Sequence, residues 1–137
     1  MIDLSPQMQQ AINNQISYEG YASNFYLALA YWCDDQALEG CKKFFIRHSD
    51  EERFHMLKLY EYMSESGVLP ITPAIAQPPI NYTSIQEAFQ KVFEQERSVT
   101  LSIHNLLKLA QDENDYNTQH FLQWYVDEQR EEEAVIR

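Results

Sequence analysis

The chain has 137 residues, of which 45% are hydrophobic, 13% aromatic and 23% charged, and its formal net charge is −11. This length suits one domain rather than two, so we expect a single domain over residues 1–137 with a sizeable apolar core. The net negative charge repels nucleic acid and anionic membranes and attracts cations, so we expect neither nucleic acid nor a membrane as a partner.

The cysteines and the length of the apolar runs indicate the cellular compartment of the protein. Cys33 and Cys41 are eight residues apart, which is typical neither of a redox pair nor of a zinc site, and both lie on apolar stripes. We therefore expect two buried free thiols. No apolar run reaches the length of a membrane span, and the N-terminus lacks the pattern of a signal peptide. These features predict a soluble, cytoplasmic protein.

Two long helices are predicted in the first half of the chain. Ser5 and Pro6 provide an N-cap and a proline at the first helical position. An apolar stripe at steps of three and four residues follows and reaches Cys33. A second stripe covers residues 38–62, and Gly67 is well placed to end this helix.

The second half of the chain predicts a long loop and two more helices. Residues 67–83 hold four prolines and show no helical period, which indicates a loop. A third helix is predicted from Ser84, where Glu87 three residues later gives a capping box, and its stripe runs to Ala110. The polar stretch 111–115 is predicted as a short turn before a last helix.

The lengths of the connections predict the topology. Two short turns make helices one and two, and helices three and four, antiparallel pairs. The loop of 17 residues can span roughly 55 Å when extended, which exceeds the length of roughly 45 Å of a helix of about 30 residues. The predicted fold class is therefore all-α, a four-helix bundle in which a long crossover leaves helices two and three parallel.

Polar residues interrupt the apolar stripe near the middle of each helix. In chain order these interruptions are Glu19, Glu52 with His55, Glu96, and Gln129 with Glu132. A buried carboxylate without a partner costs several kcal/mol, and four on facing helices would also repel one another. Either they are protonated or a cation holds them together. Carboxylates with one imidazole and no thiolate form a ligand set for iron or manganese.

Two segments, which contain Glu52, His55, Gln129 and Glu132 among these residues, resemble the bacterial non-haem ferritins, members of the ferritin-like di-iron family. They are WCDDQALEGCKKFFIRHSDEERFHM, around helix two, and FLQWYVDEQREEE, in helix four. The resemblance extends over residues 5–137 and implies a ferritin-like bundle with an intrasubunit di-iron centre.

The resemblance also implies the members of that centre. They are Glu19, Glu52 and His55 for the first iron, and Glu52 as a bridge, Glu96, Glu132 and the neighbouring Gln129 for the second. Tyr26 matches the family's tyrosine beside the site, which implies a catalytic role, although an ordinary core tyrosine bonded to a ligand glutamate would look the same in sequence.

Helix four distinguishes this chain from other relatives. Bacterioferritins and rubrerythrins repeat Glu-x-x-His there, whereas this chain has a glutamine, Gln129, and a glutamate, Glu132. The second iron is therefore expected to have fewer strong ligands. Arg53 stands where bacterioferritins have the methionine that binds haem, so no haem is expected.

A further acidic cluster is formed by Glu51, Glu128 and Glu131, which match the extra iron site of bacterial ferritins. The resemblance implies a third iron there. The alternative is an ordinary solvated acidic face, because glutamates three residues apart are common on exposed helices.

The function implied by the resemblance is iron storage with ferroxidase activity. Fe(II) would be oxidised to Fe(III) by dioxygen or hydrogen peroxide, and ferric mineral would be stored in a homo-oligomeric cage, which has 24 subunits in the family. The family's short fifth helix is absent from this sequence, which ends at Arg137 within helix four. A rubrerythrin-like peroxidase and a helical interaction protein that binds no metal are the alternatives.

Overall fold

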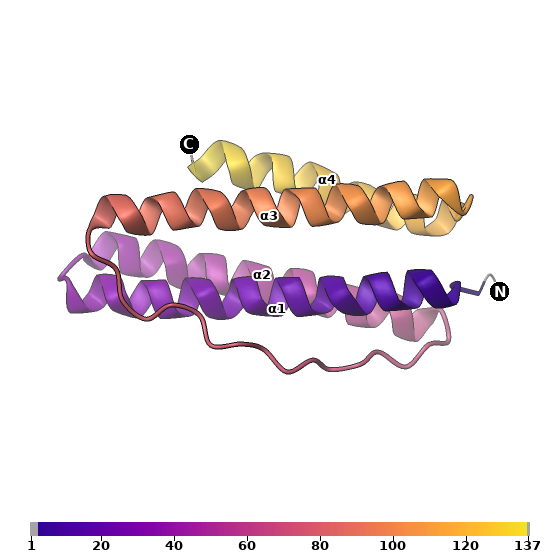
Figure 1. Ribbon diagram of the computed structural model, residues 1–137, viewed down its shortest axis with the longest axis horizontal. Helices are drawn as coiled ribbons and strands as arrows, with labels where there is room; N and C mark the ends of the chain where they lie inside the picture. Colours follow the sequence, from indigo (N-terminus) through magenta and orange to yellow (C-terminus); the bar gives the residue numbers. More distant parts are fainter. Residues whose placement is uncertain (1–2, 137) are drawn as a thin grey trace.

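The computed structural model describes residues 3–136, which form four α-helices (Figure 1). The helices are α1 (Pro6–Asp35), α2 (Glu39–Glu65), α3 (Ile85–Asp112) and α4 (Tyr116–Ile136). No strand occurs within residues 3–136, so the all-α prediction is confirmed. In the same part of the chain, no helix combines the length and apolar composition needed to cross a bilayer.

Serine side chains begin α1 and α3, as predicted. Ser5 Oγ accepts the backbone N–H of Met8 at 3.0 Å, and Ser84 Oγ accepts the backbone N–H of Glu87 at 3.1 Å. The capping box of α3 is only half formed, because the Glu87 carboxylate accepts the hydroxyl of Thr83 rather than the Ser84 backbone N–H.

The first three helices end in the same way. Ala37, Gly67 and Asn114 adopt left-handed conformations with φ of 59°, 78° and 55°. In each case the next residue donates its N–H to the carbonyl five residues earlier, at 2.8 to 2.9 Å. The stop predicted at Gly67 is confirmed. The turn between α3 and α4 is shorter than predicted, because α3 continues through Asp112.

The long loop crosses the whole bundle. In Figure 1 it leaves the C-terminal end of α2, runs along the outside of α1 and enters α3 at the opposite end of the molecule. Helices α2 and α3 therefore run in the same direction, which confirms the predicted crossover. Ile71 in the loop donates its backbone N–H to Asn13 Oδ1 at 3.0 Å. The side chain of Ile75 covers Gly20, where a Cβ would lie 2.6 Å from Ile75 Cδ1.

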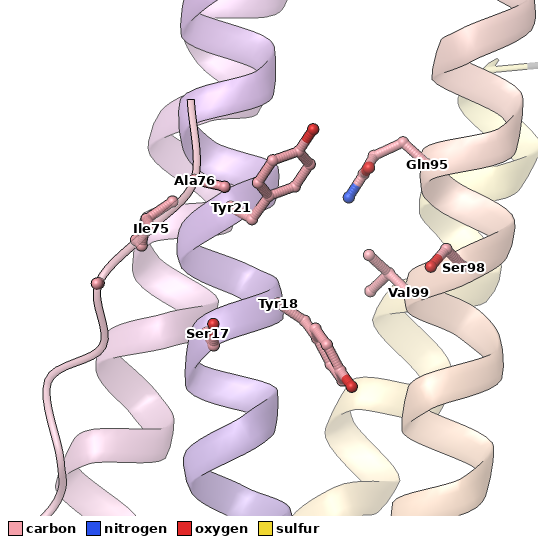
Figure 2. Close-up of a pocket in the computed structure, with 9 residues that line it drawn as sticks. Ser17, Tyr18, Tyr21, Ile75, Ala76, Gln95, Ser98 and Val99 are labelled. Carbon is pink, nitrogen blue, oxygen red and sulfur yellow. The ribbon is translucent and has the colours of Figure 1, made fainter. Parts of the chain in front are cut away.

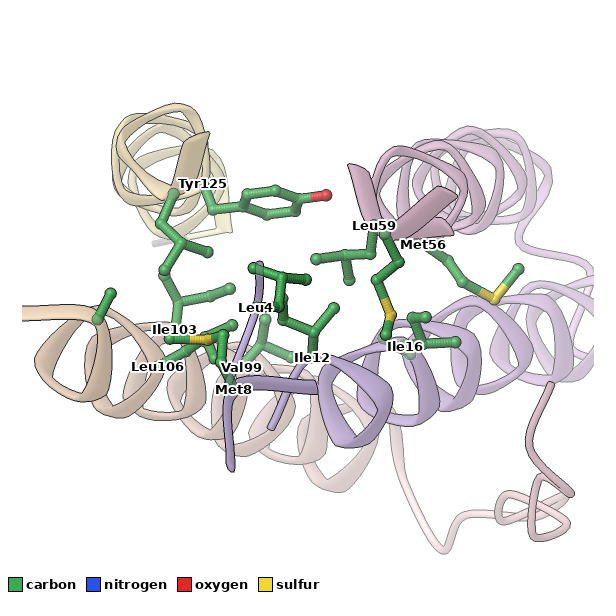
Figure 3. Packing of buried hydrophobic residues seen from close by; sticks show 14 residues of the cluster. Leu4, Met8, Ile12, Ile16, Met56, Leu59, Val99, Ile103, Leu106 and Tyr125 are labelled. Atoms are coloured by element: carbon green, nitrogen blue, oxygen red, sulfur yellow. The ribbon is translucent and has the colours of Figure 1, made fainter. Parts of the chain in front are cut away.

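The apolar core forms two clusters, one in each half of the bundle. The cluster in Figure 3 lies toward the N-terminal end of α1 and includes Ile12, Leu59 and Ile103. The other cluster includes Phe45 and Val92. Buried polar side chains lie between the two clusters on α2, α3 and α4, and among residues of the first cluster on α1; they include Gln15, Glu19, His48, Glu52, His55, Glu96, Gln129 and Glu132. We call this level the middle of the bundle.

The two cysteines differ in their environment. Cys33 is buried, as expected, but Cys41 is only half-buried near the start of α2, and both are free thiols. The expectation of two buried thiols is therefore correct for Cys33 alone. Cys41 lies in the first turn of α2, at the edge of the cluster that contains Cys33.

Candidate metal centre

The middle of the bundle brings together carboxylates from all four helices. One oxygen each from Glu19 and Glu52 and one nitrogen of His55 lie within 4.8 Å of one another. Oxygens of Glu52, Glu96 and Glu132 form a second group within the same limit. Glu52 belongs to both groups, which is the arrangement that a bridging carboxylate between two metal ions requires.

These carboxylates are nearly inaccessible to solvent. Glu19 and Glu52 are 0% exposed, Glu96 is 1% and Glu132 is 5%. Four of their oxygens accept no hydrogen bond of good geometry; they are Oε2 of Glu19, both oxygens of Glu52 and Oε2 of Glu132, which has only the Nδ1 of His48 nearby. Buried acceptors without partners cost free energy. Because all four belong to residues of the two groups, divalent cations at these positions would satisfy them together.

His55 is the only nitrogen ligand of the two groups. Its Nδ1 lies 3.3 Å from Glu52 Oε2 and 3.7 Å from Glu19 Oε2. Burial lowers the pKa of His55, but the neighbouring carboxylates of Glu19 and Glu52 outweigh this effect and raise the pKa to about 11. Without metal, a proton on the imidazole therefore offsets part of the negative charge that a cation would otherwise neutralise.

Glu96 is held by two donors. Tyr26 donates its hydroxyl to Oε1, and Gln129 Nε2 donates to Oε2 at 2.7 Å and to the Glu96 backbone carbonyl at 3.0 Å. Burial raises the pKa of Glu96 to about 7, opposed by the hydrogen bond from Tyr26. Burial and the Glu96 carboxylate raise the pKa of Tyr26 well above its ordinary value, so its hydroxyl is a neutral donor. With Nε2 engaged, only Oε1 of Gln129 could bind a metal.

His48 lies beside these ligand groups, although no role was predicted for it from the sequence. Its side chain is buried, and Nδ1 lies 3.0 Å from Glu132 Oε2 and 3.8 Å from Glu51 Oε2. Burial acts to lower the pKa of His48, but Glu132 and Glu51 raise it. The signal in the sequence is the spacing, because His48 precedes Glu52 by four residues and shares its face of α2.

The cluster of Glu51, Glu128 and Glu131 lies beside the buried centre. All three residues line a pocket of about 260 Å³ that also reaches Glu132. Glu51 and Glu128 each form a possible ligand group with Glu132 and a histidine. Glu131 lines the pocket but belongs to none of the ligand groups among the described residues.

A second pocket, of about 340 Å³, lies between α1, α3 and the long loop (Figure 2). Tyr18 and Tyr21 of α1 line it together with Gln95 of α3 and Ile75 of the loop. Its lining contains no carboxylate and no imidazole, so this pocket lacks the ligands of a metal site.

A four-helix bundle with a long crossover and a carboxylate–imidazole centre in its interior is the arrangement of the ferritin-like di-iron proteins. The ferritin-like domain family matches residues 9–137, and the chain belongs to this family. A probable bacterial non-heme ferritin-like protein of Haemophilus influenzae is 42% identical over 133 residues, which are 97% of this chain and 81% of that protein. A bacterial non-heme ferritin of Staphylococcus aureus is 40% identical over 133 residues, 97% of this chain and 80% of that protein.

Solved structures agree with this assignment. The ferritin of Chlorobium tepidum superimposes with a TM-score of 0.95 at 36% identity, over 97% of this chain and 81% of that one. An open pore ferritin from Archaeoglobus fulgidus gives a TM-score of 0.95 at 38% identity, over 98% of this chain and 83% of that one. The predicted ferritin-like fold is therefore confirmed.

Proposed function

We propose that this chain oxidises Fe(II) and stores the Fe(III) product. The observation that carries the proposal is Glu52, a fully buried carboxylate with two unpartnered oxygens that belongs to both ligand groups. Membership of the ferritin family favours iron over manganese as the metal. The family and its ferritin relatives disfavour both the rubrerythrin-like peroxidase and the interaction protein that binds no metal.

In this proposal two Fe(II) ions bind as substrate at the middle of the bundle. The first is held by Glu19, Glu52 and His55. The second is held by Glu52, Glu96 and Glu132, with Gln129 close by through its Oε1. Each Fe(II) loses one electron. The two electrons, with two protons, reduce dioxygen to hydrogen peroxide, or hydrogen peroxide to two water molecules. Anionic ligands stabilise Fe(III) over Fe(II) and so favour the oxidation.

Tyr26 is proposed as a catalytic residue beside the second iron. Its hydroxyl donates to Glu96, which supports a role in holding that ligand while iron binds. Its ring stacks on Phe45 with centroids 5.8 Å apart, and this packing limits the positions that the hydroxyl can take.

Glu51, Glu128 and Glu131 are proposed to bind a third iron. Their pocket opens beside Glu132, which also belongs to the second iron's ligand group. Iron could therefore move between the buried centre and the pocket while one carboxylate remains bound to it. This supports a role of the pocket in the transfer of iron between the centre and the mineral.

Storage requires a cage, and we propose that the chain assembles as a homo-oligomer of 24 subunits, as the family resemblance implies. Large apolar side chains that a monomer leaves in water support an oligomer. Leu27 and Tyr31 of α1 are 45% and 54% exposed, and Leu69 and Ile71 of the loop are 86% and 64% exposed. Light scattering on the whole chain tests this proposal, which a monomer or a dimer at all concentrations would contradict.

An anaerobic titration with Fe(II), followed by the addition of oxygen, tests the ferroxidase proposal. The native chain should bind Fe(II) saturably and then show rapid growth of ferric absorbance. Glu52→Ala should lose both irons and the rapid phase, because it removes the proposed bridge. Glu61→Ala, a control at an exposed position of α2, should behave like the native chain. Rapid oxidation in Glu52→Ala would overturn the assignment.

A further inference from the structure

Gln15 is a buried residue whose side-chain amide belongs to neither of the two ligand groups. It lies on α1 one helical turn before Glu19, and its side chain is 1% exposed. Its Nε2 donates to Glu19 Oε1 at 3.1 Å. The other oxygen of Glu19, Oε2, has no donor and lies 3.7 Å from His55 Nδ1.

The bond from Gln15 makes the two oxygens of Glu19 unequal. Oε1 accepts the Gln15 amide, whereas Oε2 accepts no hydrogen bond and lies on the side of His55. A carboxylate without such a donor can rotate between one-oxygen and two-oxygen binding. An amide donor fixes its orientation without adding positive charge, so it does not repel an incoming cation as lysine or arginine would.

Glu96 and Glu52 provide an internal comparison. Glu96, at the other end of the centre, is also held by a buried glutamine, Gln129, on its Oε2. Glu52 has no donor on either oxygen, as a bridge to two cations requires. Glu19 and Glu96 therefore each have an amide donor, whereas the shared Glu52 has none, and Glu132 faces the imidazole of His48 instead.

We propose that Gln15 is a positioning residue that holds Glu19 as a one-oxygen ligand and so raises the affinity of the first metal position. The identification of the metal as iron rests on the proposed function. The orientation of Glu19 by Gln15 does not depend on the proposed function, because an oriented carboxylate would bind any divalent cation of similar size.

The surroundings of Gln15 decide which substitution is informative. Gln15 also lines a surface pocket of about 200 Å³, together with Asn14 and Ser102. A short side chain at this position would connect the pocket to Glu19 and admit water. Gln15→Leu keeps most of the volume and removes only the donor, and Gln15→Met does the same with an unbranched side chain.

The test uses zinc ions as a redox-inert probe, titrated into the metal-free whole chain by calorimetry. Gln15→Leu and Gln15→Met should weaken the tighter binding step by about 10-fold to 100-fold, the usual effect of removing a hydrogen bond to a ligand, and leave the weaker step nearly unchanged. Gln10→Leu is the matched control, because Gln10 is exposed on the same helix and bonds only to Asn14. It should bind zinc like the native chain.

A double-mutant cycle separates positioning from packing. In a Glu19→Ala background, Gln15→Leu should cause no further loss of zinc affinity, because the residue acts through Glu19. Native affinity in the Gln15 variants, or an equal loss at both steps, would overturn the proposal, as would a further loss in the Glu19→Ala background. If the native chain binds zinc in this way but does not oxidise Fe(II), the proposed function fails and the role of Gln15 stands.

Discussion

The hydroxyl of Tyr125 on α4 donates a hydrogen bond to the backbone carbonyl of His55 on α2 at 2.6 Å. Both residues are buried, at 2% exposure each. Burial raises the pKa of Tyr125, so the hydroxyl stays a neutral donor. This bond joins the α1–α2 hairpin to the α3–α4 hairpin at the residue that provides the imidazole of the proposed first metal position.

Tyr125→Phe should therefore lower the free energy of unfolding of the metal-free chain by about 1 kcal/mol, the usual net contribution of one hydrogen bond. Urea denaturation followed by far-ultraviolet circular dichroism measures the change. Tyr116→Phe is the control, because Tyr116 is 72% exposed and its substitution should leave the midpoint unchanged. Equal midpoints for native chain and Tyr125→Phe would show that this bond does not stabilise the contact between the hairpins.

Fe(II) should bind in two steps of unequal affinity. The group with His55 offers an imidazole and two carboxylates, whereas the group with Glu96 and Glu132 offers carboxylates and the amide oxygen of Gln129. The position that includes His55 should fill first. Anaerobic calorimetric titration measures both steps, and His55→Ala should abolish the tighter one. Two equal affinities in the native chain would contradict this prediction.

Simultaneous replacement of Glu51, Glu128 and Glu131 by alanine should change the ratio of iron oxidised to oxygen consumed. The reason is that these residues line the open pocket and none of them belongs to the ligand groups proposed for the first two irons, so two Fe(II) per chain should still bind. Oxygen consumption measured with an electrode gives the ratio.

The control for this triple variant removes three acids that are exposed elsewhere on the bundle. These are Glu61, Glu94 and Asp127. Their replacement lowers the negative charge equally and should leave the ratio at its native value. Native stoichiometry and native rates in the pocket variant would assign the cluster to an ordinary solvated face.

The metal-free chain should lose stability as pH rises from about 5 to 9. Glu96 has a folded pKa of about 7 against an ordinary value of 4.5, so the folded state binds this proton more tightly. Its contribution is full below pH 4.5 and is lost as pH rises through 7, on the order of 3 kcal/mol. His55, raised from 6.5 to about 11, acts in the same direction at higher pH. Burial likewise raises the pKa of Glu52.

Thermal unfolding in the presence of a chelator, at several pH values, measures this dependence. Glu96→Gln should flatten the decline between pH 5 and 7, and Glu94→Gln, at an exposed position of α3, should not. Excess zinc should reverse the trend, because the cation then replaces the protons and binds more tightly as the carboxylates ionise. A stability that rises from pH 5 to 9 without metal would contradict the prediction.

Much of the architecture followed from the sequence alone. The steps of three and four residues predicted which face of each helix is buried, and Ser5, Ser84 and Gly67 predicted where three helix termini lie. The length of the loop, compared with the length of a helix, predicted the crossover. The polar interruptions of the stripes predicted which carboxylates face the interior, because a residue on the buried face of one helix in a bundle necessarily faces the other helices.

The tertiary structure decided the relationships between helices. That Gln15 holds one oxygen of Glu19, that His48 reaches Glu132, and that Tyr125 bonds to the carbonyl of His55 depend on how far each helix is rotated and shifted along its axis relative to its neighbours. Periodicity within a single helix specifies a buried face but not this offset. The offset is set by the packing of apolar side chains from all four helices, and it determines which donor meets which oxygen.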